Sequence, residues 1–383
     1  MSMIIRYQTC CFEFPQELSD HIFETLQNDS SSLKNCSLVC RAWLYATRTY
    51  LFRHVILTPK NIVPFKFLIT DSPSTIHAHI RKLELRRIDF SNRRVISYFS
   101  STLTHLHLRD MTFNTFIDIL DIICSFPRLQ SVALDGITVE TSSAGRPTCI
   151  KNKVLPSFVN SVRYRGGCLR TFLSWLLHHT NVPKIPHLYI GPIDQGNIFE
   201  VGKYVSFVGP ALRHLSFSFD IGHSTHHSCA FQDPLTTEPE DMKVSSIARR
   251  YRKIYGFNVC PNIGTLTGLR SLHFDNFIHF EDHAQNSALV WSPRILASSR
   301  AVDLQEVILG VSLRKAGELD GFNIRWDFFD EMFASMDEPY ENLVSLKFEI
   351  TGTVNMDGIA SLIRSRLPCC DRRGLLRFYR ENQ

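Results

Sequence analysis

The sequence predicts an α/β protein, in which a small N-terminal module of three helices precedes an irregular solenoid of strand–helix repeats. We expect the strands to form a parallel sheet on the concave face of the solenoid. Apolar residues recur at helical spacing between residues 14 and 57, and from residue 80 a short strand-like apolar motif returns nine times. Helix-like stretches such as residues 115–123 and 169–177 lie between these motifs. Strands that alternate with helices at a near-constant period indicate a repeat array.

The module begins at a proline that suits the first turn of a helix. Pro15 lacks an N–H group, and this group would be unpaired at that position in any case. Leu18, Ile22 and Leu26 follow at steps of four, which is one stripe of a helix. Residues 28–30 interrupt the stripe with Asn-Asp-Ser, and each of these side chains offers an N-cap for a second helix.

The remaining helical part of the module carries apolar residues on two faces. Val39 and Trp43 form one stripe, and a second stripe beside it consists of Leu33, Cys36, Ser37, Cys40 and Leu44. A domain of about 45 residues buries only a small part of its surface. These side chains therefore either pack against the rest of the chain or form a docking surface for another protein, and periodicity alone leaves both alternatives open.

Residues 14–57 resemble an F-box. The resemblance rests on the opening Phe-Pro-Gln-Glu-Leu, on Ser-Leu-x-x-Cys-Ser-Leu-Val-Cys-Arg-x-Trp at residues 32–43, and on the closing Leu-Phe-Arg at residues 51–53. Phe14 stands where the family usually has Leu. The resemblance implies docking onto the adaptor of an SCF-type cullin–RING ubiquitin ligase. The implied adaptor-binding residues are Phe14, Pro15, Leu18, Ile22, Leu33, Leu38, Val39, Cys40 and Trp43.

The strand-like motif has the form apolar-x-x-apolar-x-apolar. The first five spacings between copies are 23 to 30 residues, and this strand–helix rhythm resembles a leucine-rich-repeat horseshoe. The Asn or Cys that this family places three residues after the third apolar position is absent, so we expect an irregular arc with longer helices outside. Apolar residues take its place at Ile88, Met111, Ile137 and Phe277. The nine motifs begin at Ile80, Leu103, Leu129, Val159, Ile185, Leu212, Leu269, Leu304 and Leu343.

These patterns divide the chain into four parts. We expect the F-box-like domain at residues 12–58 and a connector at residues 59–78. The divergent repeats follow at residues 79–367, with a protruding insertion at about 220–262, and residues 368–383 form a tail.

Composition limits the classes of partner. With 44% apolar and 21% charged residues, the 383-residue chain has the composition of an ordinary soluble protein, and its net charge of +5 is scattered, so nucleic acid is an improbable partner. No apolar run approaches eighteen residues, which argues against a membrane span. Eleven cysteines without a secretory signal indicate reduced thiols, and thus a cytoplasmic or nuclear location or both.

No motif indicates catalysis or a cofactor. The sequence lacks a phosphate-binding Gly-rich loop, Gly-x-Ser-x-Gly and His-Glu-x-x-His, so we predict that the protein is not an enzyme. His223 and His227 are spaced to share a helix face, but no paired Cys-x-x-Cys accompanies them, and a polar loop is the simpler interpretation. A basic run at residues 249–253 could touch phosphates, yet such runs are commonly solvated helix faces.

Alternation along the strands predicts which side chains face the concave surface. Because the apolar residues of each motif point into the core, the residues between them point outward. The exposed set is basic and rich in histidine in the first half of the array. It forms either a solvated sheet face or the surface that binds a target protein, through an acidic or phosphorylated segment. The candidate target-binding residues are Lys82, Arg86, His105, His107, Arg109, Arg163, Arg165, His187 and Tyr189.

The resemblances together imply a non-catalytic substrate receptor. The module would hold the ligase adaptor, and through it a cullin, while the repeats would hold a target protein for ubiquitination. The alternative is a protein-interaction scaffold that binds the adaptor without directing ubiquitin transfer. Both alternatives use the same adaptor-binding residues, so the sequence does not separate them.

Overall fold

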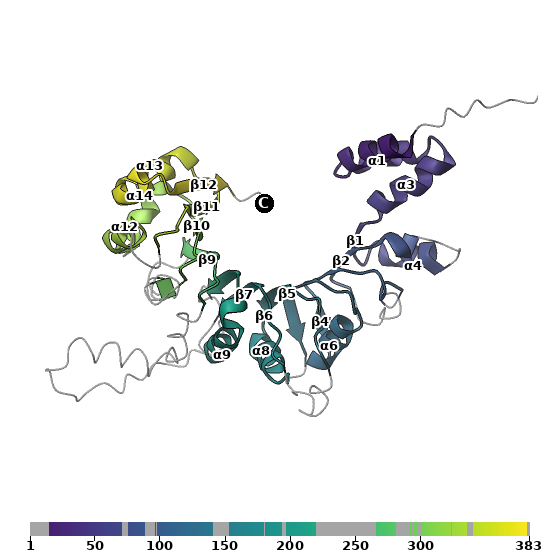
Figure 1. Ribbon diagram of the computed structural model, residues 1–383, viewed down its shortest axis with the longest axis horizontal. Coiled ribbons are helices and arrows are strands. Elements are labelled where there is room, and N and C mark those ends of the chain that lie inside the picture. The colour runs from purple at the N-terminus through teal and green to yellow at the C-terminus, as the bar shows by residue number, and fades with distance from the viewer. Residues whose placement is uncertain are drawn as a thin grey trace, which may run out of the picture.

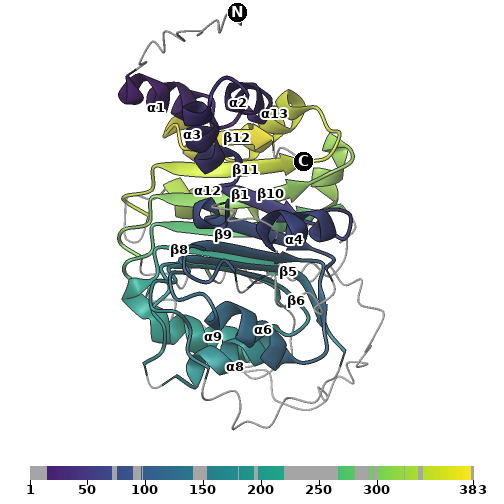
Figure 2. The same ribbon diagram turned by 90° about the vertical axis from the view of Figure 1, so that its right-hand side faces the viewer.

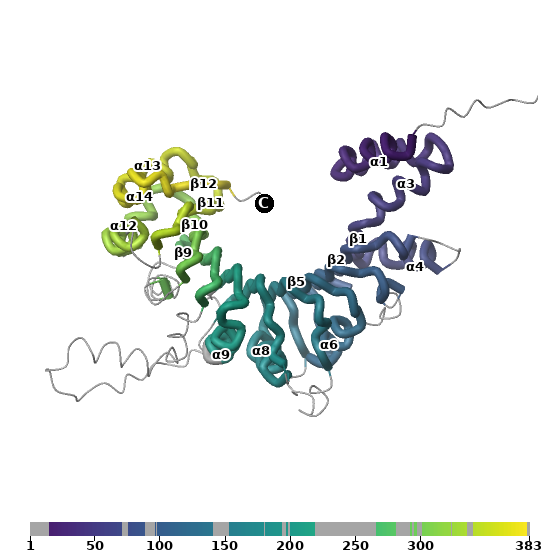
Figure 3. Tube along the Cα trace, viewed as in Figure 1, coloured from purple at the N-terminus to yellow at the C-terminus, as the bar shows by residue number. Residues whose placement is uncertain are grey.

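The chain forms an arc whose inner side is a single long sheet (Figure 1; Figure 3). Its computed structural model describes residues 15–70, 76–88, 96, 98–140, 153–179, 181–193, 197–219, 266–280, 292, 295–296, 301–322, 324–334 and 340–380. Within these residues the sheet has twelve strands, all paired in parallel, and the helices cover its outer side. The predicted α/β solenoid with a parallel sheet on its concave face is confirmed.

A module of three helices projects from the N-terminal end of the arc (Figure 2). The helices are α1 (Gln16–Thr25), α2 (Ser30–Ser37) and α3 (Arg41–Leu51). Asp29 caps α2, because its carboxylate accepts hydrogen bonds from the N–H groups of Ser31 and Ser32 at 3.0 and 3.1 Å. The interruption at residues 28–30 therefore separates two helices, as the sequence predicts.

The strands of the sheet follow one another in chain order, and a short strand, β4, pairs with β5 beside this path. All nine predicted motifs contribute a strand. The strands are β1 (His54–Leu57), β2 (Lys82–Arg86), β3 (His105–Arg109), β4 (Thr112–Phe113), β5 (Ser131–Val139), β6 (Ser161–Gly166), β7 (His187–Ile193), β8 (His214–Phe219), β9 (Ser271–His279), β10 (Glu306–Ser312), β11 (Ser345–Thr351) and β12 (Leu376–Arg380).

The helices on the outer side include both helix-like stretches that the sequence predicts. Thr115 begins the first with a capping box, in which its hydroxyl and the Asp118 carboxylate each bond the other residue's backbone. The α-helices are α4 (Ile62–Thr70), α6 (Phe116–Cys124), α8 (Leu169–Leu177), α9 (Ile198–Val208), α12 (Trp326–Ala334), α13 (Met356–Arg366) and α14 (Pro368–Arg372), and the 3-10 helices are η1 (Ile76–His79), η3 (Gly209–Ala211) and η5 (Ala316–Gly321).

The core lies between the sheet and these helices. Matching apolar positions of adjacent strands pair in register, so that Leu83 lies beside Leu106 and Leu188 lies beside Leu215. Side chains in such rows stack along the solenoid and bury one another. The sequence predicts that the apolar residues of each motif are buried, and six leucines at the second or third apolar position are each at most 1% exposed, which confirms the alternation: Leu106, Leu134, Leu188, Leu215, Leu272 and Leu346.

A left-handed residue occupies the same repeat position in three neighbouring repeats, directly after β2 and β3 and within β5. Arg87, Asp110 and Gly136 have φ angles of 52°, 51° and 62°. The apolar residue after each turn, Ile88, Met111 or Ile137, is at most 6% exposed. At this position of these three repeats a left-handed turn and a buried apolar side chain thus replace the polar residue that regular leucine-rich repeats use.

The structure differs from the predicted boundaries at both ends of the array. β1 pairs with β2, and α4 follows it on the outer side, so the solenoid begins at His54 within the predicted module, and the predicted connector 59–78 contains a repeat helix. At the other end, α14 and β12 continue the fold, and β12 pairs with β11. The expectation of a tail from residue 368 was therefore wrong. The predicted insertion at 220–262 lies outside the described residues.

Candidate functional site

The helical module exposes an apolar surface at positions that the sequence assigns to adaptor binding. Leu18 is 51% exposed, Leu38 is 84% exposed and Val39 is 65% exposed. Pro15 and Cys40 are also exposed. Leu38 and Val39 directly follow α2, where the chain turns into α3. We call Leu18, Leu38 and Val39 the apolar tip of the module. Phe14, the first of the predicted adaptor-binding residues, lies outside the described residues.

Three other predicted adaptor-binding residues belong wholly or partly to the interior of the module. Leu33 is 1% exposed, and Ile22 and Trp43 are half-buried. Trp43 packs edge-to-face on Phe23, with 5.1 Å between the ring centroids. Phe23 is fully buried, and sequence reasoning missed it because the stripe Leu18–Ile22–Leu26 was the apolar pattern that it followed along this helix. Burial of Ser19 and Phe23 instead turns α1 so that Leu18 faces outward.

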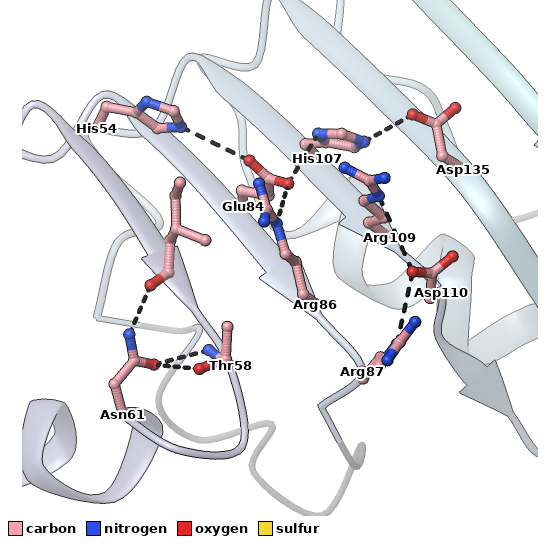
Figure 4. A network of polar contacts seen from close by, with 11 residues as sticks. His54, Thr58, Asn61, Glu84, Arg86, Arg87, His107, Arg109, Asp110 and Asp135 are labelled. Carbon is pink, nitrogen blue, oxygen red and sulfur yellow. Dashed lines mark hydrogen bonds and ion pairs between the residues drawn. The ribbon is translucent and has the colours of Figure 1, made fainter. Parts of the chain in front are cut away.

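Charged side chains cover the first half of the concave face, and Glu84 is their first centre (Figure 4). Its carboxylate lies 2.5 Å from Arg86 Nε, 3.6 Å from His107 Nδ1 and 3.9 Å from His54 Nε2. Burial acts to raise the pKa of Glu84, but the hydrogen bond from Arg86 and the charge of His107 outweigh it and lower that pKa. Glu84 is thus an ionised acid that holds basic groups from β1, β2 and β3.

His107 connects Glu84 to the next acid along the sheet. Its Nε2 atom lies 2.8 Å from Asp135 Oδ2 on β5, as Figure 4 shows. Burial acts to raise the pKa of Asp135, but the hydrogen bond and charge of His107, followed by the charges of Arg163 and Arg165, lower it. The imidazole therefore bridges two carboxylates and is not the freely exposed residue that the sequence predicts.

Asp275 on β9 is a second centre of polar contacts. Its carboxylate accepts a hydrogen bond from Ser216 at 2.8 Å, lies 3.3 Å from His273 Nδ1 and forms an ion pair with Arg165 of β6. β7 and β8 lie between the two partners of this ion pair. The residue of β7 in register with Arg165 is Gly191, which has no side chain over which the guanidinium would have to pass.

The C-terminal part of the concave face also carries basic side chains that are paired with acids. Lys347 of β11 forms an ion pair with Glu306 of β10 and lies 5.5 Å from the ring centroid of Tyr379. The Glu306 ion pair is the main cause of a raised pKa at Lys347. His273 Nε2 lies 3.3 Å from Glu349. Bases and acids therefore pair along much of this surface.

Histidines line the concave face where the strands begin. His187 and His214 occupy matching positions on β7 and β8, and their rings stack 4.5 Å apart at an interplanar angle of 9°. Burial lowers the pKa of His187, and burial followed by the charge of His187 lowers the pKa of His214. His105 occupies a similar place on β3, where its Nδ1 atom lies 2.9 Å from the Thr104 hydroxyl.

All nine candidate target-binding residues lie on strands of the one sheet, but they do not form one open basic surface. Arg86, His107 and Arg165 are paired with acids, and Arg163 lies over the Tyr189 ring at 5.1 Å from its centroid. The strand pattern also exposes Glu84 and Asp275 on this face, but sequence reasoning missed Asp135 and did not predict which basic groups the acids pair with. The residues so placed are Lys82, Arg86, His105, His107, Arg109, Arg163, Arg165, His187 and Tyr189.

Among the described residues, no three His, Cys, Asp or Glu side chains are grouped so that they could hold a metal ion. The segment with His223 and His227 lies outside that part of the chain. No helix in the described ranges has the length and apolar character needed to span a membrane.

The sequence has no match among protein-family models or among curated proteins. Among solved structures, the leucine-rich repeat-containing protein LegL7 from Legionella pneumophila is similar to this chain. The two share 12% sequence identity, with a TM-score of 0.42, and the alignment covers 84% of this chain and 94% of that one. A likeness at this level carries no functional information.

Proposed function

We propose that this protein is the substrate-recognition subunit of an SCF-type cullin–RING ubiquitin ligase. The helical module would bind the ligase adaptor, and the concave face of the solenoid would bind a target protein. The observation that carries the proposal is the apolar tip, because Leu18, Leu38 and Val39 are large apolar side chains that the chain itself leaves uncovered. Exposed large apolar side chains, such as the adjacent Leu38 and Val39, mark candidate interaction sites, and all three residues are also positions of the F-box-like pattern.

The proposed role requires no bond chemistry from this chain. Holding a target and a ubiquitin-conjugating enzyme in one complex raises their effective concentration, and this alone accelerates transfer. The arc supports such a role, since solenoids present long concave surfaces to partners. The role belongs to the cytoplasm or the nucleus, where ubiquitin ligases of this class act.

The paired charges of the concave face bear on the kind of target. A uniformly basic surface would attract acidic segments in general. Here acids such as Glu84, Asp135 and Asp275 hold the basic groups, and a partner must replace or extend these pairs. Such a surface favours a target with both signs of charge in matching positions, since complementarity gives specificity more than raw affinity.

Binding of the full-length chain to purified ligase adaptor tests the proposal. Replacing Leu38 and Val39 together by Ser removes two exposed side chains without touching the buried Phe23 and Leu33. We expect a loss of affinity of about thirtyfold or more, the size usual for central interface residues. The matched control is Val154→Ser with Val344→Ser, since these valines are 65% and 67% exposed on the solenoid.

The outcomes of this experiment are distinct. Binding that the control retains and the Leu38/Val39 variant loses supports the proposal. Equal binding by the wild type and the Leu38/Val39 variant, or no binding by the wild type, would contradict it. The scaffold alternative shares the adaptor contact and differs in the fate of the partner. Proximity labelling with ligase activity blocked would identify partners, and reconstituted ubiquitination of a captured partner would then favour the receptor.

A further inference from the structure

A cavity lies where the helical module joins the solenoid. Its volume is about 410 Å³. The C-terminal end of α3 and the residues after it form one wall, and η1 with the first residues of β2 and β3 forms the other. We call it the junction pocket, and its lining residues are Thr49, Tyr50, Arg53, His79, Arg81, Lys82, Thr104, His105 and Gln130.

The lining is basic and contains no acid. Arg53, Arg81 and Lys82 are basic, and no carboxylate of the described residues forms an ion pair with any of them. This differs from the rest of the concave face, where Arg86 and Arg165 have carboxylate partners. A concentration of unpaired cations in a concave site attracts anions.

Arg81 is held in place by the backbone around it. Its Nη1 atom donates to the carbonyl of Ala78 at 2.8 Å and to that of Thr102 at 3.5 Å. Arg53 and Lys82 are exposed and make no such contact in the described structure, so their charged ends are available to a ligand. The pocket thus combines one fixed guanidinium with two adjustable cations.

The two histidines of the pocket respond to this positive charge. Burial, and after it the charges of Arg81, Arg48 and His77, lower the pKa of His79. Burial, and after it the charges of Lys82, Arg53 and His54, lower the pKa of His105. Their Nδ1 atoms lie 3.3 Å from the Thr49 hydroxyl and 2.9 Å from the Thr104 hydroxyl. The rings are therefore oriented by neighbouring hydroxyls, and the charges that act on them are all positive.

We propose that the junction pocket binds a phosphate monoester dianion, held between α3 and the first residues of β2 and β3. Two negative charges and three terminal oxygens match a site that offers three cations and two imidazoles. A carboxylate has one negative charge and would balance a smaller part of the positive charge of the pocket. The phosphate could belong to a modified side chain of a partner peptide or to a free small molecule, and the chemistry of recognition is the same for both. The proposal does not depend on adaptor binding, because no residue of the apolar tip lines the pocket.

Isothermal titration of the full-length chain tests the proposal with three probes at constant ionic strength. The probes are a short phosphoserine peptide, the same peptide with unmodified serine, and inorganic phosphate. We expect binding of at least one phosphate probe, none of the unmodified peptide, and a loss of about tenfold or more in Arg53→Gln with Lys82→Gln. In the described structure Arg53 and Lys82 make their hydrogen bonds through backbone groups, which these substitutions retain, so this variant should keep the fold.

The matched control removes the same charge elsewhere. The control is the double variant Lys60→Gln/Lys66→Gln. Lys66 lies on α4 and Lys60 precedes it, and both lysines are exposed and outside the pocket lining. This variant should bind the phosphate probes as the wild type does. Tighter binding of the phosphopeptide than of inorganic phosphate would assign the site to a peptide. Equal binding would assign it to the phosphate group alone. No binding of either phosphate probe, or equal losses in both double variants, would overturn the proposal.

Discussion

Arg165 on β6 forms an ion pair with Asp275 on β9, across the two strands that separate them. Three inter-strand steps of about 4.8 Å would place the two backbones about 14 Å apart on a flat sheet. The contact depends on the concave curvature, on the length of the arginine and on Gly191 in between. Through Asp275 this pair also reaches Ser216 and His273. These contacts therefore join β6, β8 and β9 into one polar network.

Removing Asp275 should destabilise the fold more than removing its partner. Asp275→Ala leaves the Ser216 hydroxyl and the Arg165 guanidinium without their acceptor, and should lower the free energy of unfolding by about 1–3 kcal/mol. Arg165→Ala removes a half-exposed cation and should cost less than about 1 kcal/mol. Urea denaturation of both single variants and the double variant measures these values. Equal losses in the two single variants would contradict this interpretation of the network.

A core leucine and a tip leucine should behave oppositely on truncation. Leu134 is fully buried in the row that runs between sheet and helices, so Leu134→Ala should lower the free energy of unfolding by about 2–5 kcal/mol. Leu38 is 84% exposed, and Leu38→Ala should change the free energy of unfolding by less than about 0.5 kcal/mol. Chemical denaturation checks both values. A large loss in Leu38→Ala would mean that the apolar tip is part of the fold and is not available for docking.

The stacked histidines should make stability depend on pH. Because the pKa values of His187 and His214 are lowered in the folded chain, the unfolded chain binds more protons below about pH 6.5. The free energy of unfolding should therefore fall as the pH drops from 7.5 to 5.5. Two charged groups also face His214, since Glu306 acts to raise its pKa and Arg270 acts to lower it. In the double variant His187→Gln/His214→Gln, the free energy of unfolding should fall less over the same pH range. Thermal unfolding at several pH values measures this fall. An equal fall in the wild type and the double variant would refute the role of the two histidines.

Asp330 should prove essential to the C-terminal end of the array. Its side chain is buried on α12, and its two oxygens accept hydrogen bonds from the backbone N–H groups of Cys369 and Cys370 at 2.9 and 2.8 Å. Asp330→Ala should lower the free energy of unfolding by about 1–3 kcal/mol, because buried donors lose their acceptor. Asp330→Asn keeps one acceptor and should lose less. Hydrogen exchange of β12 offers a local readout, and unchanged protection in Asp330→Ala would contradict this role.

The repeat motif predicted the nine strands that it describes, because alternation depends only on neighbours along the chain. It missed β1, β4 and β12. His54–Leu57 follows a helical module directly, and its four residues were assigned to the end of that module. Leu376–Arg380 follows a pair of cysteines and two arginines, a composition typical of a tail. Short edge strands acquire their identity from the neighbour with which they pair, and that neighbour is distant in sequence.

The candidate sites were predictable in position but not in pairing. Exposure of Leu38 and Val39 and the sheet position of Arg165 follow from local patterns. The Arg165–Asp275 pair joins residues 110 positions apart, and no local pattern identifies it. Phe23 was missed because Leu18, Ile22 and Leu26 form the more apolar stripe, whereas Phe23 shares its stripe with Ser19 and Gln27. Packing against Trp43 nevertheless buries Phe23. The junction pocket requires both walls to be in place, so no single segment predicts it.

The central claim is that the apolar tip connects this chain to a cullin. The most direct measurement is affinity purification of the tagged full-length chain from its own cells, with cullin quantified relative to the tagged chain by mass spectrometry. The account predicts that cullin co-purifies with the wild type and with Val154→Ser/Val344→Ser, and falls about tenfold or more with Leu38→Ser/Val39→Ser. Absence of cullin from the wild-type sample, or equal amounts with both double variants, would contradict it.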